Sequence, residues 1–501
     1  MLEKYIVENI KSFPVGGMKG RRKIKTVVKE ITAENVIDVV NEALSIHLQN
    51  AAEINYLYNY YKGYQDILGK RKHVREEINN KVIINRANEI VTFKTSYLLN
   101  EPIQYISYGG EKSVSDKVNT LNRYMRDEDK ESKDKEIVDW MHICGVGERL
   151  VLDDKEAGKE DGAPFCIFTQ DPRYAFVIYN IGIGEPPIAG VILQVNEDNI
   201  QYADVYTKYK HFVITGDEIK EYPTMYDGIP LIEYLNNEAR LGAFEVVLSI
   251  LNNINILESN AIDSIEDFVN GFDVFQNCDI EDGEYSELAL GGKAVRIKTV
   301  TQGMEAKVYR VYSELNQMGV QARIDDLTED YLTICGMPNR NGGSSTSDTG
   351  TAVIYRDGFA EAESRAKDTE KMFIRSERQM LKIVLRICDI VNSGAQSLNL
   401  RLSDIDTQFL RENLVNLQSR VQVLCELLNN EKVHPKYAFE VAALFKDNDE
   451  AFRVSYEWYL QNKENELELL NELPKKALLQ EHNSQQIEET EQDISGEDNN
   501  V

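Results

Sequence analysis

The first 145 residues place apolar side chains at helical spacing. Val36, Val40, Leu44 and Leu48 recur every four residues, which predicts a helix over about 33–62. Further helices are expected at 84–99, ahead of Glu101-Pro102, and at 113–144. This part of the chain is therefore expected to be mainly helical.

The pattern changes at Gly147. From there to about Tyr234 the chain consists of short β-branched and aromatic runs separated by turn signals such as Gly182-Ile-Gly-Glu-Pro-Pro187. The expected strands are 148–153, 164–169, 174–180, 188–195, 200–206 and 209–215. The fold is thus predicted to be α+β, mainly helical, with a β-rich insertion at 147–234.

Residues 236–268 contain almost no helix breaker and predict one long helix. Its apolar side chains fall on two stripes, which indicates contact with more than one neighbour rather than with a single core. The stripes are Leu241, Phe244, Leu248 and Leu251, and then Val247, Ile250, Ile254 and Leu257.

A small α/β unit is expected at 270–310, followed by a helix at 312–335. That helix ends at Gly336-Met-Pro338, a glycine cap with a proline behind it. The elements expected after it are a flexible loop at 339–350, a long charged helix at 351–392, shorter helices at 404–480 and a disordered acidic tail at 481–501.

The charge of the chain bears on its partners. Its 501 residues include 84 acidic and 56 basic ones, for a formal net charge of -28. Such acidity argues against a protein that clamps nucleic acid by charge. The first 30 residues are nevertheless locally basic, which fits either a solvated arm or an arm that contacts nucleic acid or a partner.

No apolar run is long enough to cross a bilayer, and the N-terminus lacks the layout of a signal peptide. We therefore expect no membrane partner, and a protein that stays in the compartment where it is made. Five tyrosines between Tyr56 and Tyr64 fit either helix packing or a platform on which bases stack.

Catalytic and metal-binding motifs are missing from the sequence. The six cysteines form no CxxC, the six histidines form no HExxH, and Cys144 with nearby His142 is interpreted as core. The loop at 339–350 is no P-loop, because no lysine occurs between 308 and 366. No catalytic residue, cofactor or metal is predicted.

Four segments resemble the portal, or head-to-tail connector, proteins of tailed bacteriophages of the siphophage type. They are Tyr60-Tyr-Lys-Gly-Tyr-Gln-Asp-Ile67; residues 80–103, ending Tyr97-Leu-Leu-Asn-Glu-Pro-Ile103; Gly228-Ile-Pro-Leu-Ile-Glu-Tyr-Leu-Asn-Asn237; and Gly350-Thr-Ala-Val353. Asn100 stands where these portals usually have glycine. The order and spacing of the segments carry the resemblance over roughly 30–480.

The resemblance implies a ring subunit with wing, stem, clip and crown regions. The implied divisions are a basic arm (1–30), a wing (31–235), a stem helix (236–269), a clip (270–311), a second stem helix (312–336), a tunnel loop (337–350), a long wing helix (351–400), a helical crown (401–480) and the acidic tail (481–501). In a ring each copy packs against a neighbour on either side, which would account for the two stripes of the stem helix.

The resemblance also implies residues that face DNA and residues that pack the stem. The implied channel residues are Asn339, Arg340, Asn341, Gly342, Gly343, Ser344, Ser345, Thr346, Ser347, Asp348 and Thr349. The implied stem contacts are Leu241, Phe244, Val247, Leu248, Leu251, Ile254 and Leu257. One arginine and one aspartate leave the loop net neutral, which suits weak, non-specific contact with DNA that must slide.

The implied function is a homododecamer, or a 13-mer when recombinant, that forms the double-stranded DNA channel at one capsid vertex and nucleates procapsid assembly. Its implied partners are the terminase large subunit, the connector or adaptor protein, and the scaffolding and major capsid proteins. Its implied location is the virion, with the host cytoplasm during assembly. The alternatives are another neck or tail ring protein, or an enzyme with an unrecognised active site.

Overall fold

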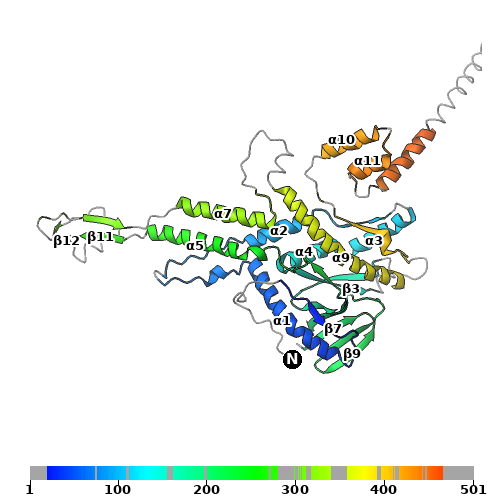
Figure 1. Ribbon diagram of the computed structural model, residues 1–501, viewed down its shortest axis with the longest axis horizontal. Coiled ribbons are helices and arrows are strands. Elements are labelled where there is room, and N and C mark those ends of the chain that lie inside the picture. Colours follow the sequence, from blue (N-terminus) through cyan, green and yellow to red (C-terminus); the bar gives the residue numbers. More distant parts are fainter. Residues whose placement is uncertain are drawn as a thin grey trace, which may run out of the picture. The chain divides into compact units, whose positions relative to one another are not determined.

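The structure is a computed structural model of the chain (Figure 1). It describes residues 20–73, 76–108, 112–154, 162–196, 200–269, 272–279, 298–299, 303, 305, 307–311, 317–339, 358–391, 397–409, 411, 417–430, 432–442, 444–445, 448 and 450–465. The chain divides into two compact units. The first contains residues up to 103 and 121–402, and the second contains 104–120 and 403–501.

The β-rich insertion of the first unit forms two sheets. The larger sheet has the order β1 (Ile24–Thr26), β5 (Ala175–Asn180), β6 (Pro187–Val195), β7 (Gln201–Thr207), β8 (Lys210–Thr215) and β9 (Glu218–Pro223). The smaller has the order β10 (Leu231–Leu235), β3 (Val146–Asp153) and β4 (Phe165–Gln170). All neighbours in both sheets are antiparallel except β1 and β5, which are parallel.

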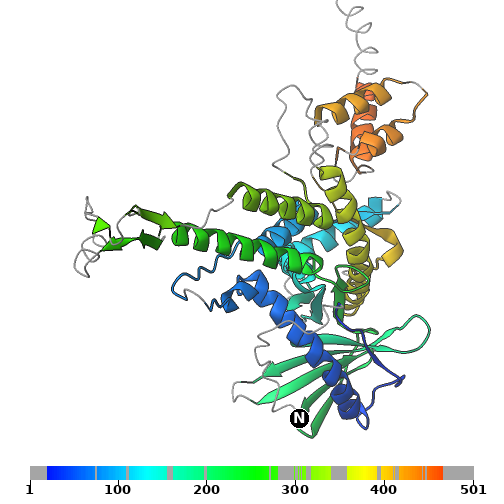
Figure 2. The ribbon, with the colours of Figure 1, turned by 60° about the vertical axis from the view of Figure 1, so that its left-hand side comes forward.

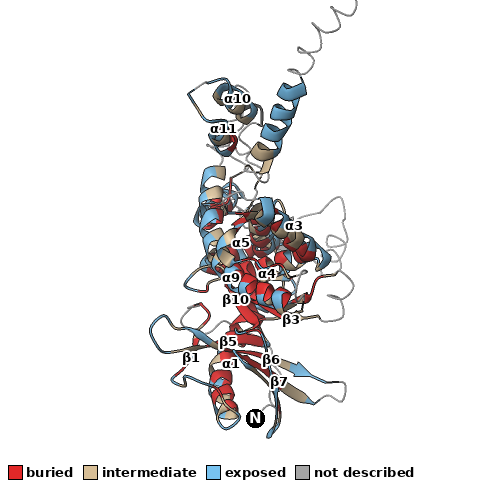
Figure 3. Cartoon of the chain, turned by 90° about the vertical axis from the view of Figure 1, so that its right-hand side faces the viewer, coloured by how far each residue is buried: buried red, intermediate tan, exposed pale blue. Residues whose placement is uncertain are grey.

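One long helix covers the larger sheet. The helix α1 (Val36–Tyr61) lies across the strands (Figure 2), and its buried residues Val36, Val40 and Leu44 pack on Phe176 and Val205. Buried residues concentrate on α1 and on the strands that it covers (Figure 3). The apolar repeat that predicts this helix therefore also forms one of the cores.

Four further helices of the first unit share a second core. They are α2 (Arg86–Leu98), α4 (Lys130–Cys144), α5 (Leu248–Val269) and α7 (Gln317–Cys335). The helix α9 (Phe359–Val391) lies outside this core and packs on β10 and β3. The C-terminal half of α1 joins α2, α4, α5 and α7 in one buried cluster. In Figures 1 and 2, α5 and α7 lie side by side.

The long helix expected at 236–268 starts later than the sequence predicts. Residues 236–244 are irregular, a 3₁₀ turn covers Glu245–Val247, and α5 begins at Leu248. The side chain of Asn237 accepts a hydrogen bond from the Leu241 amide and donates one to the Leu241 carbonyl, so the backbone is satisfied without helix. Gly242 packs so closely on Ile143 that a Cβ there would lie 2.4 Å from the Ile143 carbonyl oxygen.

The basic arm is not a solvated segment over its described part. Arg21 is buried, with ion pairs of 3.2 Å to Glu53 and 2.7 Å to Glu245, and Arg22 also pairs with Glu53. Lys23 and Lys25 both pair with Glu185. The arm is therefore part of the fold from Gly20 onward, and residues 1–19 lie outside the described part.

The second unit begins with a strand pair that the sequence patterns do not predict. β2 (Gln104–Ser107) pairs antiparallel with β15 (Ile405–Gln408), although the region 401–480 is expected to be helical. The helices of this part are α10 (Leu417–Leu428), α11 (Pro435–Ala442) and residues 450–465. α3 (Lys112–Asp127) crosses the boundary between the units at Thr120.

Most of the expected clip lies outside the described residues. Its described part has β11 (Phe272–Gln276) antiparallel to β14 (Lys307–Val311), and β12 (Cys278–Asp279) antiparallel to β13 (Lys298–Thr299). The channel residues from Arg340 to Thr349 also lie outside the described part, whereas Asn339 is described.

Candidate functional site

A ladder of polar side chains on α5 holds an extended segment against this helix. The amides of Asn80, Val82 and Ile84 donate to the side chains of Asp263 (2.7 Å), Ser259 (3.0 Å) and Asn255 (2.9 Å), respectively. Two residues of extended chain span about 6.6 Å, and four residues of helix span about 6 Å. Alternate amides of the segment therefore meet successive turns of α5.

Charge reinforces the outer end of this ladder. Lys70 and Lys72 form ion pairs of 2.7 and 3.0 Å with Asp263. Burial raises the pKa of Asp263, but the hydrogen bonds from Lys70, Asn80 and Lys72 outweigh it and hold the pKa well below its usual range. The carboxylate is thus ionised at neutral pH and ties the loop before Asn80 to α5.

Most of the expected stem contacts are buried within the chain itself. Phe244, Val247, Leu248, Leu251 and Ile254 belong to the core shared with α1, α2 and α7, and Leu257 packs against it half-buried. Leu241 is half-buried in the irregular stretch before α5. The two stripes therefore meet several elements of one subunit.

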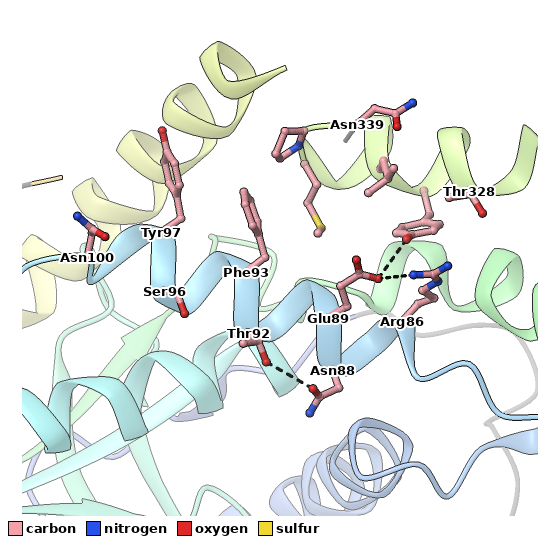
Figure 4. Close-up of a pocket in the computed structure, with 14 residues that line it drawn as sticks. Arg86, Asn88, Glu89, Thr92, Phe93, Ser96, Tyr97, Asn100, Thr328 and Asn339 are labelled. Carbon is pink, nitrogen blue, oxygen red and sulfur yellow. Dashed lines mark hydrogen bonds and ion pairs between the residues drawn. The ribbon is translucent and has the colours of Figure 1, made fainter. Parts of the chain in front are cut away.

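A groove lies between α2 and α7 where the chain leaves α7 (Figure 4). Its volume is about 630 Å³, and Asn339 lines it. Glu89 pairs with Arg86 at 2.8 Å and accepts a hydrogen bond of 3.3 Å from the Tyr331 hydroxyl. Of the expected channel residues, Asn339 is thus the one that the structure places, at the base of the expected tunnel loop.

A buried network of ion pairs attaches α9 to α4, β3 and β10. Glu377 is 0 % exposed and lies 2.7 Å from the Lys130 ammonium, 3.6 Å from the Arg149 guanidinium and 2.6 Å from the Tyr234 hydroxyl, which donates to it. Asp134 completes the network with contacts of 2.6 and 2.7 Å to Lys130 and Arg149. Two cations balance two anions, so α9 is fixed to α4, β3 and β10 without net charge.

Three of the five tyrosines between Tyr56 and Tyr64 pack within the subunit. Tyr56 and Tyr60 are buried, with hydroxyls that donate to Asp66 and Asn252. Tyr58 stacks on the indole ring of Trp140, a residue of α4. Packing within the subunit therefore accounts for these three rings.

The sequence matches the family of phage portal proteins described as SPP1 Gp6-like over residues 41–473. The chain belongs to this portal family. The resemblance drawn from its four segments and the mixed α+β fold are both confirmed. Portal proteins are structural components of phage particles.

Comparison with solved structures finds 111 matching chains. A chain titled "Virion of native gene transfer agent (GTA) particle" has a TM-score of 0.40 at 9% identity, with 78% of this chain and 94% of that chain covered. A chain titled "Neck of empty GTA particle computed with C6 symmetry" has a TM-score of 0.39 at 9% identity, with 72% and 90% covered. Comparison with curated proteins gives no match.

Among the described residues, none of the helices is long and apolar enough to span a membrane. Within the same part of the chain, no three His, Cys, Asp or Glu side chains gather as a metal site would require. Cys144 and His142 are buried in α4.

The polar ladder is the feature that sequence patterns missed. Asn255, Ser259 and Asp263 stand four residues apart on α5, and each is at most 2 % exposed. Polar residues at i, i+4 and i+8 between two apolar stripes are a sequence signal for a polar partner along the helix. The sequence does not say that residues 80–84 are that partner.

Proposed function

We propose that the chain assembles with copies of itself into a closed ring that forms the channel for double-stranded DNA at one vertex of a phage capsid. The observation that carries the proposal is the match to the portal family over residues 41–473. The ring would have twelve subunits in the particle and twelve or thirteen when the protein is purified alone.

Exposed apolar side chains on the paired helices support assembly. Large apolar residues exposed on a folded subunit are typical of surfaces that are buried in a complex. On and beside α5 and α7 they are Val246, Ile256, Ile262, Ile265, Met318 and Ile334. A ring formed by head-to-tail contacts covers two different faces of each subunit, which suits residues spread around both helices.

Charge supports a channel through which DNA slides. Twelve copies of a chain with net charge -28 carry -336 in total, and such a ring repels phosphate except where cations are placed locally. Arg340 and Asp348 leave residues 339–349 neutral. Lysines in place of residues 341–347 would therefore add phosphate contacts and slow packaging; an unchanged packaging rate would contradict sliding on a weakly interacting loop.

Under the proposed function, different partners would bind the ring at different stages of particle assembly. The terminase large subunit would dock at the clip during packaging, and the connector or adaptor protein would replace it there afterwards. Scaffolding and major capsid proteins would surround the wing as the ring nucleates a procapsid in the host cytoplasm. The ring would be a docking platform, and ATP hydrolysis would belong to the terminase.

Native mass spectrometry and negative-stain imaging of the purified protein test the ring. A closed ring of twelve or thirteen subunits with a central hole is expected. Ile256→Asp with Ile334→Asp should shift the population to smaller species, while Ile183→Asp, at a fully exposed position between β5 and β6, should leave the ring intact. A wild-type monomer that persists at all concentrations, with and without scaffolding protein, would contradict the proposal.

A position test separates a portal from another neck or tail ring. Labelled protein should appear at one vertex of procapsids before any tail has joined. Label restricted to tails or to finished necks would favour the alternative structural protein.

A further inference from the structure

The segment that joins α1 to α2, residues 62–86, is a local exception to the acidity of the chain. It has seven basic and three acidic residues, hence a net charge of +4, whereas the whole chain carries -28. The basic residues are Lys62, Lys70, Arg71, Lys72, Arg75, Lys81 and Arg86, and the acidic ones are Asp66, Glu76 and Glu77. We call residues 62–86 the basic segment.

Two cations of the basic segment are exposed beside α5. Lys70 and Lys72 both pair with Asp263 of α5, so Arg71 between them points to the other side of the extended chain, and it is exposed. Arg71 makes no hydrogen bond or ion pair with any described residue. Lys81 is exposed as well, and its ammonium donates a hydrogen bond to a backbone carbonyl of the same segment. Both charges are therefore accessible to a partner.

The exposed face of α7 carries the opposite charge. This helix has four acidic residues and one basic residue, hence a net charge of -3. The acidic residues are all exposed, and they are Asp325, Asp326, Glu329 and Asp330. Arg323 lies 3.8 Å from Asp326, whereas Glu329 and Asp330 form no ion pair with any described residue. The buried residues Ile324, Leu327 and Tyr331 lie on the other side of the helix, so the acidic face points away from the core.

The two charged surfaces lie on opposite sides of α5. In both Figure 1 and Figure 2, α7 runs along one side of α5, and the described part of the basic segment runs along the other. Neither surface can therefore reach the other within one subunit. Each also has exposed large apolar side chains, which are Tyr64 and Leu68 on the basic segment and Met318 and Ile334 on α7.

We propose that the acidic face of α7 in one subunit binds the basic segment of the next subunit around the ring. The inference rests on the proposed function, since it names the surfaces that join the copies. A ring built by head-to-tail contacts needs two different surfaces that fit each other, one on each side of the subunit. Opposite charge on the two surfaces favours this contact, and like charge opposes contact of α7 with α7.

Charge reversal on one surface at a time tests the contact. Glu329→Lys with Asp330→Lys makes both surfaces basic, and Arg71→Glu with Lys81→Glu makes both acidic. At about 0.1 M salt, where charges within about 10 Å still interact, each double variant alone should show about a tenfold or greater fall in the fraction of protein in closed rings. The matched control is Glu218→Lys with Glu221→Lys on the exposed strand β9, which should keep the wild-type fraction.

A mixture of the two double variants gives the sharper result. Each contact in the mixture pairs opposite charges only when it joins two unlike subunits, so a closed ring must alternate between them. Such a ring contains equal numbers of both variants and an even number of subunits. Native mass spectrometry of the mixture should therefore show restored rings of twelve at a ratio of one to one, and no ring of thirteen.

The outcomes separate this contact from the ring itself. Circular dichroism and the midpoint of thermal unfolding show whether each variant is folded. Folded variants that close rings alone as well as the wild type does, or a mixture that restores no ring or gives odd or unequal ones, would overturn this inference and leave the proposed function standing. A wild-type protein that forms no ring would contradict the proposed function and this inference with it.

Discussion

Replacing Glu377 by glutamine should destabilise the first unit far more than any exposed charge on the same helix. Glutamine keeps the shape of the side chain and can still accept the Tyr234 hydrogen bond through its one oxygen. Its NH2 group then faces the Lys130 ammonium, so the change removes the charge and one acceptor. It leaves Lys130 and Arg149 with Asp134 as their one anion in the network, and hence one uncompensated buried positive charge.

The size of the effect follows from the contact distances. At 2.7 Å between the Lys130 ammonium and the Glu377 carboxylate, Coulomb's law with an effective dielectric constant near 20 gives an attraction of about 6 kcal/mol. The cost of desolvating both groups offsets part of it. Removal of one partner from a buried pair costs about 3–5 kcal/mol of unfolding free energy, and we expect Glu377→Gln to fall in this range.

Urea unfolding followed by tryptophan fluorescence measures this free energy. The chain has two tryptophans, and Trp458 is exposed, so a Trp458→Phe background leaves Trp140 on α4 as the reporter. The double variant Lys130→Met with Glu377→Gln restores neutrality and should cost at least about 2 kcal/mol less than the two single changes together.

An exposed pair on the same helix is the matched control. Lys371 and Asp368 lie 3.0 Å apart, with side chains 75 and 72 % exposed, and Asp368→Asn should cost less than about 0.5 kcal/mol. The reasoning is refuted if Glu377→Gln costs no more than this control, or if the double variant costs the sum of the single ones.

Three further outcomes are expected. Asp263→Asn should lower the free energy of unfolding by about 2 kcal/mol at pH 7 and speed hydrogen exchange at the Asn80 amide. Because folding lowers the Asp263 pKa, this difference in unfolding free energy from the wild type should shrink as the pH falls below about 4. A difference that stays constant with pH would contradict this. Gly336→Ala should lower the free energy of unfolding, measured by calorimetry, by about 1–2 kcal/mol, because φ is +64° and the new methyl would lie 2.7 Å from Arg365 Cγ. Unchanged stability would contradict this close packing at the end of α7. A maleimide should modify exposed Cys425 well before buried Cys144, whose thiol pKa burial raises to about 12, and mass spectrometry showing equal rates would contradict the burial of α4.

The sequence predicts elements well where one local pattern determines them. The α1 helix and the strands β3 to β8 lie close to their expected ranges, because periodic apolar positions and turn residues are local signals. The predicted start of α5 at residue 236 is wrong, because the side-chain amides of Asn236 and Asn237 donate hydrogen bonds to the Leu241 carbonyl in place of helical backbone bonds. No glycine or proline at 236–237 marks this interruption in the sequence. Such local competition between side chains and helix is invisible to periodicity.

Contacts between distant segments were beyond the sequence patterns. β2 and β15 pair across about three hundred residues, and each has only four residues, too few for an alternating pattern to stand out. The local sequence predicts that Arg21 belongs to a basic arm, because its ion-pair partners Glu53 and Glu245 are far away in sequence. The family resemblance, which the family match confirms, is the basis of the proposed function. The residues that build the α5 ladder are recognised only from their geometry.

The ends of the segment between α7 and α9 lie next to each other. A Cβ on Gly358 would lie 3.5 Å from Pro338 Cα and 3.7 Å from the Met337 carbonyl oxygen, so the chain returns to the place where it left. The cost of closing a loop between adjacent ends changes slowly with its length, by about 0.6 kcal/mol for each doubling. α7 is packed in the core through Tyr331, and α9 is fixed by Glu377. A doubling of the length of the segment between Asn339 and Gly358 should therefore lower the free energy of unfolding by only about 0.6 kcal/mol, and a much larger loss would contradict this reasoning.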